Sequence, residues 1–274
     1  MRVEIIPATA ARMAEIQTWL EVEQAAYDTA AAALETGLDP DVELPERGFL
    51  CNWHLVQRSF AKDQNNVHVL IVDGAAVGFL DEMDFLEVRP DQRDRGFGRL
   101  LAEFMVERAF GKGQSVAEIE IAPESALPFW RQMQFTADLN RRGSGGGIYA
   151  FKRLIRRFEL GDGPRVPYRV AFHPPSRDWD KATPPFHVFD GMAEMLPDGS
   201  IRLPERAYCF DDTQSTSIDC VVRIEVSGER LFEDKVKRPM ARDFGLHLDS
   251  GYIYFLDAIT PQNARRKADV PNFR

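Results

Sequence analysis

The chain has 274 residues, 44% hydrophobic and 28% charged, which is typical of a folded globular protein long enough for two domains. No run of about 18 apolar residues occurs and the first residues fit a strand rather than a signal peptide, so we expect no membrane association and a cytoplasmic location. The net charge of −9 lies mostly in residues 1–154, with 24 acids against 16 bases, which argues against nucleic-acid binding. Ten acids fall in the first 50 residues, indicating either a solvated acidic surface or a site that attracts cations.

The first part of the chain alternates strand and helix patterns. Residues 3–7 predict a strand, and Thr9 can cap a helix in which Met13, Ile16 and Leu20 recur at helical spacing. Asp73-Gly74 is a strong signal for a hairpin between two strands. The further elements that we predict are a helix over 49–60, strands over 67–72, 76–80 and 84–88, a helix over 98–110, a strand over 116–121, a helix over 126–133 and a strand over 147–154. This order predicts an α/β (α+β) domain over 1–154, a mixed sheet with helices on both faces.

After residue 154 the character of the sequence changes. Glycines and prolines between 161 and 167 form a junction, and short strand patterns follow at 168–172, 186–189, 201–203, 220–226 and 252–256. We therefore predict a smaller, mostly β domain over 165–274, which either recruits a protein partner or forms a homodimer. Three cysteines are present, and we expect Cys209 and Cys220 to be buried thiols or, as the alternative, a pair across a hairpin. No cysteine or histidine spacing predicts a metal site; the alternative is a cluster of His173, His187, Asp178 and Asp180.

The most informative segment is 86–101, where a strand ends, a glycine-containing turn follows and an amphipathic helix begins. Gly96 and Gly98 let the backbone approach an anion closely, and the helix N-terminus directs amides toward it. Arg93, Arg95 and Arg99 add positive charge in an otherwise acidic half. A pyrophosphate is the kind of ligand that such a turn fits.

This segment resembles the coenzyme A motif of the GNAT superfamily of N-acyltransferases, Gln/Arg-x-x-Gly-x-Gly/Ala, with Arg93, Gly96 and Gly98 at the defining positions. The resemblance covers residues 3 to about 154 and implies acetyl-CoA as co-substrate, with direct transfer of the acetyl group to a primary amine. It also implies that backbone amides hold the pyrophosphate, while the preceding strand end pairs with the pantetheine and polarises the thioester. The residues that it assigns to donor binding are Val88, Arg89, Arg93, Asp94, Arg95, Gly96, Phe97, Gly98, Arg99 and Phe129.

A second family feature, Asn-x-x-Ala-x-x-Phe-Tyr, is only partly present. Ala126 and Phe129 match, whereas Pro123 replaces the asparagine and Trp130 replaces the tyrosine. That tyrosine is the usual general acid of the family, and an indole cannot protonate a thiolate. Tyr149 is the candidate substitute, with simple packing as its alternative role.

The general base should be a carboxylate near the strand before the motif. Glu82 is the first candidate, followed by Glu87 and Glu120, with a solvated or ion-paired surface role as the alternative for each. A basic, glycine-rich loop at 141–147 is either a flexible hairpin tip or a contact for the adenosine 3′-phosphate or for a carboxylate of the acceptor.

Together these features predict an acetyl-CoA-dependent N-acetyltransferase that acts on a cationic small molecule or on a protein amine. The alternative is a non-catalytic acyl-CoA sensor, which the replacements at Pro123 and Trp130 favour.

Overall fold

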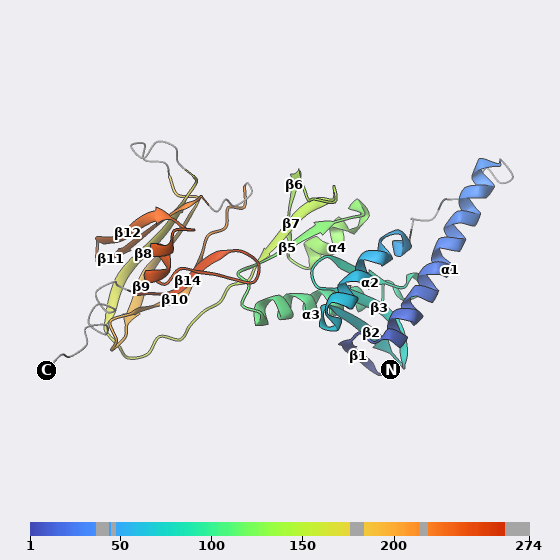
Figure 1. The fold of residues 1–274 in the computed structure, drawn as a ribbon, viewed down its shortest axis with the longest axis horizontal. Coiled ribbons are helices and arrows are strands. Elements are labelled where there is room, and N and C mark those ends of the chain that lie inside the picture. The colour runs from blue at the N-terminus through green and yellow to red at the C-terminus, as the bar shows by residue number, and fades with distance from the viewer. Residues whose placement is uncertain (37–43, 45–47, 176–183, 214–218, 261–274) are drawn as a thin grey trace. The chain divides into compact units, whose positions relative to one another are not determined.

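A computed structural model of the protein describes residues 1–36, 44, 48–175, 184–213 and 219–260 (Figure 1). The chain divides into two compact units, one comprising 1–108 and 118–150 and the other 109–117 and 151–274. The expected limits, 1–154 and 165–274, differ from this division chiefly at 109–117, which cluster with the C-terminal residues.

The order of elements in the first part of the chain follows the prediction. Its helices and strands are β1 (Val3–Pro7), α1 (Ala10–Glu35), α2 (Trp53–Lys62), β2 (Val67–Val72), β3 (Ala75–Asp81), β4 (Phe85–Val88), α3 (Phe97–Gly111), β5 (Val116–Ile121), α4 (Leu127–Gln132), β6 (Thr136–Arg142) and β7 (Ile148–Arg153). The strand β6 was not predicted as an element of its own, because its residues are polar and mostly exposed and show no apolar alternation.

The strands form two hydrogen-bonded sheets rather than one. Strands β1 to β4 pair in chain order and antiparallel, with the β2–β3 hairpin turning at Asp73 and Gly74, both of positive φ. Strands β5, β7 and β6 form the second sheet, in that order. Among the described strands, β4 therefore pairs on one side only, and its other edge carries backbone groups that no strand of the first sheet uses.

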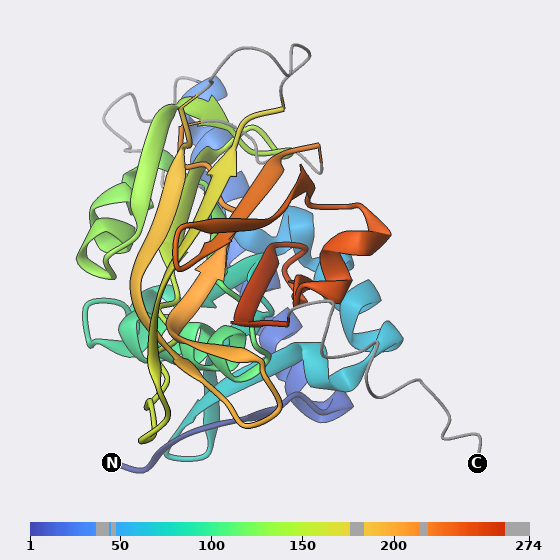
Figure 2. The same cartoon turned by 90° about the vertical axis from the view of Figure 1, so that its left-hand side faces the viewer.

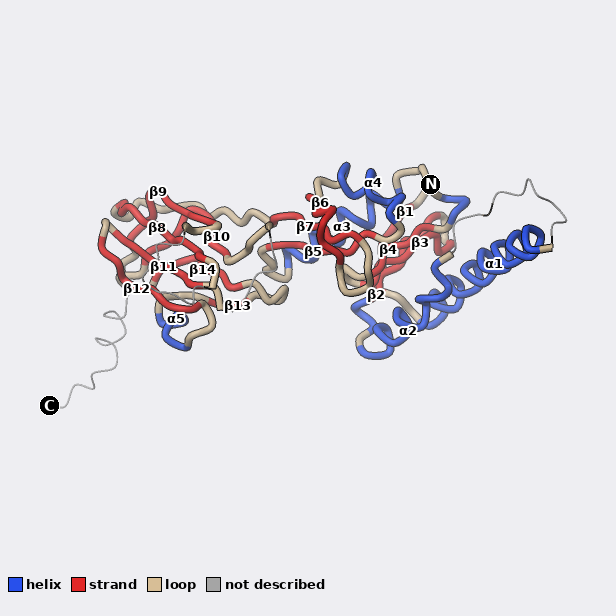
Figure 3. Tube along the Cα trace, turned by 90° about the horizontal axis from the view of Figure 1, so that it is seen from above, coloured by secondary structure: helices blue, strands red, loops and turns tan. Residues whose placement is uncertain are grey.

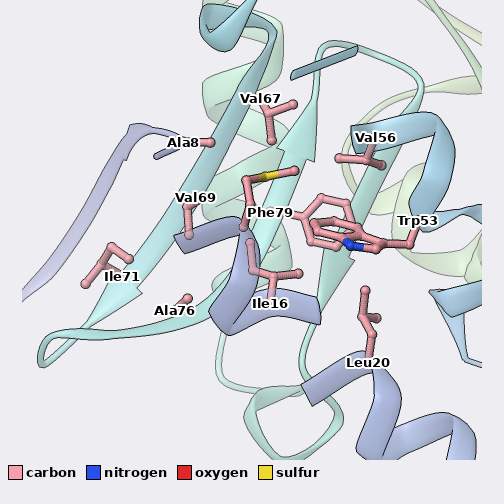
Figure 4. Packing of buried hydrophobic residues seen from close by; sticks show 11 residues of the cluster. Ala8, Ile16, Leu20, Trp53, Val56, Val67, Val69, Ile71, Ala76 and Phe79 are labelled. Carbon is pink, nitrogen blue, oxygen red and sulfur yellow. The ribbon is translucent and has the colours of Figure 1, made fainter. Parts of the chain in front are cut away.

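Helices cover both faces of the first sheet, as predicted. On one face, Ile16 and Leu20 of α1 and Trp53 of α2 pack around Phe79 of β3 (Figure 4). Thr9 caps α1 by accepting a hydrogen bond from the N–H of Arg12 at 3.3 Å. On the other face, the ring of Phe104 in α3 lies 5.0 Å from that of His68 in β2. The predicted α/β class of this part of the chain is confirmed.

The C-terminal unit contains a sheet of seven strands in the order β12-β11-β8-β9-β10-β14-β13 (Figure 2). Its elements are β8 (Arg165–His173), β9 (His187–Met195), β10 (Ile201–Tyr208), β11 (Val221–Val226), β12 (Glu229–Lys235), α5 (Pro239–Asp243), β13 (His247–Leu248) and β14 (Tyr254–Ile259). The mostly β character is confirmed, and α5 is the short helix beside this sheet (Figure 3). The strand β12 was missed because five of its seven residues are charged.

Residues 109–117, which connect α3 to β5, are held by side chains of the C-terminal unit. Arg206, only 6% exposed, donates to both carboxylate oxygens of Asp257 at 2.8 and 2.7 Å and to the carbonyl of Gly113. The N–H of Ser115 donates to Asp249 at 2.7 Å. Both contacts fall just beyond Gly111, the last residue of α3. The C-terminal end of α3 thus belongs structurally to the β-rich unit.

None of the helices in the described part of the chain combines the length and the apolar character that a membrane span requires.

Candidate functional site

The turn between β4 and α3 has the geometry of an anion site. After β4 the chain makes a tight turn over Pro90–Gln92, and Asp94 and Gly96 then adopt positive φ values of 59° and 82°. Positive φ is routine for glycine, so this turn depends on Gly96. The helix α3 begins at Phe97, and the N–H of Leu100 donates to the carbonyl of Gly96 at 3.1 Å.

The amides that follow Gly96 are free of helical partners. The N–H groups of Phe97, Gly98 and Arg99 precede the first hydrogen bond of α3, and they lie at the positive end of the helix dipole. A Cβ built on Gly96 would meet no heavy atom within 4 Å, so that side of the turn is open. An anionic group is the ligand that this combination suits.

Two of the three motif arginines are engaged at the surface. Arg99, with a side chain 72% exposed, pairs with Glu103 at 2.8 Å, one helical turn along α3. Arg95 hydrogen-bonds to Gln92 and lies 5.2 Å from the centre of the Phe97 ring. Their charge reaches the turn through solvent, so the backbone amides are the better placed ligands for an anion.

Phe129 and Val88 line the inner side of the motif. A Cβ on Gly98 would stand 3.5 Å from the Phe129 ring and 3.9 Å from Val88, which are ordinary contact distances, so the start of α3 lies against both side chains. The Phe129 ring is in turn 5.0 Å from that of Trp130, which is 5.2 Å from Phe135. The structure therefore brings Val88, Gly98 and Phe129 together, while Trp130 forms part of an aromatic stack.

Strand β4 presents Val88 to its unpaired edge. The N–H of Arg89 donates to Val77 of β3 at 2.9 Å, so by the alternation of an antiparallel ladder the backbone groups of Val88 point away from β3. The Arg89 amide is consequently used inside the sheet. The N–H of Val88 donates to Oε1 of Glu87 at 3.1 Å, and its carbonyl accepts from Nε of Arg93 at 3.1 Å. Of the two predicted pantetheine partners, Val88 is therefore the one whose backbone faces the unpaired edge. Its N–H and carbonyl are at present hydrogen-bonded to the Glu87 and Arg93 side chains.

Arg93 joins two carboxylates from different elements. Its Nη2 lies 2.9 Å from Oε1 of Glu87 and 3.7 Å from Oε1 of Glu23, which belongs to α1. Burial raises the pKa of the Glu87 carboxyl above its ordinary value, against the lowering effect of Arg93. Burial likewise raises the pKa of Glu23. Two half-buried acids therefore share one guanidinium at the start of the motif.

Glu82 lies elsewhere. It is exposed, has a φ of 46° and belongs to the turn between β3 and β4, at the opposite end of β4 from Val88. Because Val88 is opposite Gly78 in the ladder, Glu82 is four residues further along, roughly 13 Å at the spacing of a strand. Glu87 lies far nearer to the motif than Glu82 does.

Glu120 organises the glycine-rich loop. Its two carboxylate oxygens accept hydrogen bonds from the N–H groups of Gly145 and Gly147 at 2.9 and 2.7 Å. A Cβ on Gly143 or Gly145 would lie within 2.0 or 2.6 Å of that carboxylate. The loop therefore needs glycines because it wraps around a carboxylate. Both oxygens of Glu120 are already hydrogen-bonded to the loop, which favours a structural role over that of a base.

Tyr149 is packed. It is 6% exposed, donates a hydrogen bond to Glu118 and lies under the guanidinium of Arg141, 3.4 Å from the ring centre. Burial, followed by the hydrogen bond to Glu118, raises the pKa of its hydroxyl. A phenol held more firmly protonated is a weaker proton donor, so these contacts favour the packing alternative.

Sequence reasoning missed Glu23, although a signal was present. Glu23 follows Ile16 and Leu20 at spacings of seven and three, so it lies on the apolar stripe of α1 rather than on its solvated face. A carboxylate at such a position is buried by the fold; the Glu23 side chain is 14% exposed. The acidic bias of the first 50 residues concealed this one acid among many.

Among its described residues, the C-terminal unit contributes no comparable group of side chains. Cys209 and Cys220 are buried free thiols, as expected, and the hydrogen bond between them raises the pKa of Cys209. His187 packs on Phe189 with ring centres 4.1 Å apart, and burial lowers its pKa to about 4. Within the described residues no three His, Cys, Asp or Glu side chains gather closely enough to hold a metal. The alternative cluster also involved Asp178 and Asp180, which lie outside the described residues.

Comparison with known proteins gives similarity in solved structures only. No family model matches the sequence, and no curated protein matches it either. Solved structures similar to 56% of this chain include a protein from Pyrococcus horikoshii OT3, at 15% identity, 99% coverage of that chain and a TM-score of 0.40. The PaiA N-acetyltransferase of Thermoplasma acidophilum, crystallised with coenzyme A, is similar at 12% identity over 56% of this chain and 100% of its own, with a TM-score of 0.38. A GCN5-related N-acetyltransferase of Rhodopseudomonas palustris is similar at 18% identity, 56% and 97% coverage and a TM-score of 0.37.

These likenesses cover little more than half of this chain, and the identities are too low to transfer any residue's role. The function proposed below therefore rests on the geometry of the turn, of β4 and of α1.

Proposed function

We propose that the first part of the chain, residues 1–154, binds acetyl-CoA and transfers its acetyl group directly to a primary amine. The observation that carries this proposal is the turn at Gly96, where unpaired amides at the start of α3 adjoin the unpaired edge of β4. The first feature suits a pyrophosphate and the second suits an extended, amide-containing arm that adds to a sheet edge. Coenzyme A contains both, in that order.

Phe97, Gly98 and Arg99 would hold the pyrophosphate through their amides, while Phe129 and Val88 line the approach. The N–H of Val88 would donate to the thioester carbonyl and stabilise the negative charge that develops on it. That N–H now donates to Glu87, so exchanging this acceptor for the thioester oxygen would release the Glu87 carboxylate beside the reacting carbon.

Glu87 is then the base in best position. It would take a proton from the acceptor ammonium, and the resulting amine would form a bond to the acyl carbon. The C–S bond breaks and its electron pair remains on sulfur. Of the two protons that the nitrogen loses in becoming an amide, one passes through Glu87 to the thiolate and the other is released to solvent. The pKa of Glu87, raised by burial, lies closer to neutrality than that of an exposed glutamate and suits both removal and return of a proton.

Calorimetry with acetyl-CoA, and assay of free thiol released with polyamines, aminoglycosides, amino acids and peptides, test the proposal. Gly96→Glu would place a carboxylate in the anion site, so it should abolish acetyl-CoA binding while the protein stays folded. Unchanged affinity in Gly96→Glu would show that the site is misplaced. Tight binding without thiol release on any amine would favour the acyl-CoA sensor. Trp130 and the packed Tyr149 are consistent with that alternative, because neither is a good general acid.

The remaining parts of the proposal concern setting and partners. A cytoplasmic location, a cationic small molecule or protein amine as acceptor, and recruitment of a partner or homodimer formation by residues 165–274 stay predictions. Gel filtration of the full chain and fractionation of cells that express it are the direct measurements.

A further inference from the structure

The Glu23–Arg93–Glu87 cluster is unbalanced in charge. Two carboxylates lie within 3.7 Å of one guanidinium, and Arg93 is the cation that acts on both of them. Carboxylates removed from water are costly unless paired and hydrogen-bonded. One negative charge of this cluster therefore lacks a counterpart when both acids are ionised.

The carboxylate oxygen that lacks a partner is Oε2 of Glu23. Its Oε1 faces Arg93, whereas its Oε2 is buried and accepts no hydrogen bond from the described residues. A buried carboxylate oxygen without a donor is an exception in folded proteins. Burial also raises the pKa of Glu23 in spite of the nearby Arg93.

A second unsatisfied group lies on the same face of α1. Trp19 precedes Glu23 by four residues, which places the two side chains next to one another on a helix. The Nε1 of Trp19 is buried and donates to none of the described groups, and its ring lies 6.3 Å from that of Phe79. One helix face thus offers an unused acceptor and an unused donor beside aromatic rings.

We infer that Glu23 binds the ammonium group of the acceptor and thereby selects cationic amines. This inference rests on the proposed acyl transfer, and it assigns Glu23 the role of docking the amine while Glu87, across Arg93, removes the proton. An ammonium donates three hydrogen bonds and carries one positive charge, so it supplies both the donor that Oε2 lacks and the charge that the cluster lacks. The indole of Trp19, one helical turn from Glu23 and only partly buried, favours a cation with an apolar stem.

Gly48 fixes the position of this carboxylate. A Cβ on Gly48 would stand 2.9 Å from Cγ and Cδ of Glu23, closer than such atoms approach. Its φ of −67° is open to alanine, so Gly48→Ala should fold but displace the Glu23 carboxylate without changing any charge. It provides a second, independent perturbation of the same group.

The test uses the full chain, 1,4-diaminobutane as the cationic probe and 1,4-butanediol as its neutral counterpart. Calorimetry on protein saturated with coenzyme A gives the affinity for each probe, and steady-state assays with acetyl-CoA give KM and kcat for the diamine. Glu23→Gln should weaken diamine binding and raise its KM roughly 30-fold or more, as expected for truncating one partner of a desolvated charge pair. Gly48→Ala should shift both in the same direction.

Controls separate recognition from folding. Coenzyme A affinity should be unchanged in Glu23→Gln, and its thermal midpoint should not fall, because the variant removes a buried charge. Glu21→Gln, at an exposed position of α1, should leave diamine binding as it is.

Two results would overturn the inference: no diamine binding by the wild-type protein, or equal diamine affinity in Glu23→Gln. If the diamine binds through Glu23 but acetyl-CoA does not bind, the proposed transfer fails and the amine site stands.

Discussion

Replacing Gly96 by alanine separates the backbone requirement of the turn from its role as a ligand site. Gly96 has a φ of 82°, and its missing side chain faces open space, so alanine fits sterically but must adopt a left-handed conformation. That conformation costs about 1–2 kcal/mol in a residue with a Cβ. The added methyl group would also occupy the open side of the turn, where the anion is expected.

The structure supplies a matched control on the same helix. Gly113, just beyond the C-terminal end of α3, has a φ of 81°, and a Cβ built there also meets nothing within 4 Å. Gly113→Ala therefore carries the same backbone cost without touching the motif. Both variants should lose about 1–2 kcal/mol of unfolding free energy in a urea titration.

Only Gly96→Ala should lose acetyl-CoA affinity. Blocking two amide contacts to a charged phosphate, each worth about 1.5–3 kcal/mol, would weaken binding by roughly 100-fold or more. Calorimetry on both variants measures the difference directly. Equal acetyl-CoA affinities for Gly96→Ala and Gly113→Ala would refute the placement of the anion at this turn, whatever the two variants do to stability.

The remaining predictions concern Glu87 as the base, the buried Asp81 and the contacts of Arg206. Glu87→Gln should lower kcat roughly 100-fold or more and remove the acidic limb of the pH–rate profile, with coenzyme A affinity retained; an unchanged profile would exclude Glu87 as the base. Asp81 is 3% exposed, and burial raises its pKa from the ordinary 3.8 to about 6, so its contribution to stability is fully present below pH 4 and is lost as the pH rises through 6. Between pH 4 and pH 8 the wild-type protein should therefore lose up to about 3 kcal/mol of unfolding free energy through Asp81, and Asp81→Asn should not show this loss. Urea unfolding at the two pH values measures the difference. Arg206→Met would leave Asp257 and the carbonyl of Gly113 without their donor and should cost about 2–4 kcal/mol in the unfolding of the β-rich unit, whereas Met at the exposed Arg202 of the same strand should cost under 0.5 kcal/mol.

Local signals in the sequence predict the turn to which we assign the donor. The glycine turn, the strand before it and the helix after it are neighbours in sequence, and the ligand groups are backbone amides whose direction follows from secondary structure alone. The hairpin at Asp73-Gly74 and the cap at Thr9 were predictable for the same reason. Among the elements missed, β6 and β12 are polar strands whose place in a sheet is set by their neighbours rather than by their own residues; the short α5 and β13 were also not predicted.

The contacts of the candidate catalytic side chains depend on tertiary structure, and composition does not predict them. Glu82, Glu120 and Tyr149 were reasonable candidates by type and position along the chain. In the fold, Glu82 lies at the end of β4 opposite Val88, and Glu120 accepts hydrogen bonds from two loop amides. Tyr149 donates a hydrogen bond to Glu118 and packs against Arg141. The sequence near Glu120 and Tyr149 does not reveal these partners, because they lie at least 25 positions away, except Arg141, which is eight positions from Tyr149 but on the strand β6.

The same cluster that sequence reasoning missed explains how this chain could manage without a phenol at the position of Trp130. A tyrosine serves as acid when base and acid are separate groups. In the proposed complex the Val88 N–H donates to the thioester carbonyl, and Glu87, still paired with Arg93, is free to act beside the reacting carbon as both base and acid. Because burial raises its pKa, Glu87 is better suited than an exposed glutamate to accept a proton from the amine and to return one to the thiolate. Glu23 then has the complementary task of keeping the ammonium charge beside Arg93 until that transfer begins.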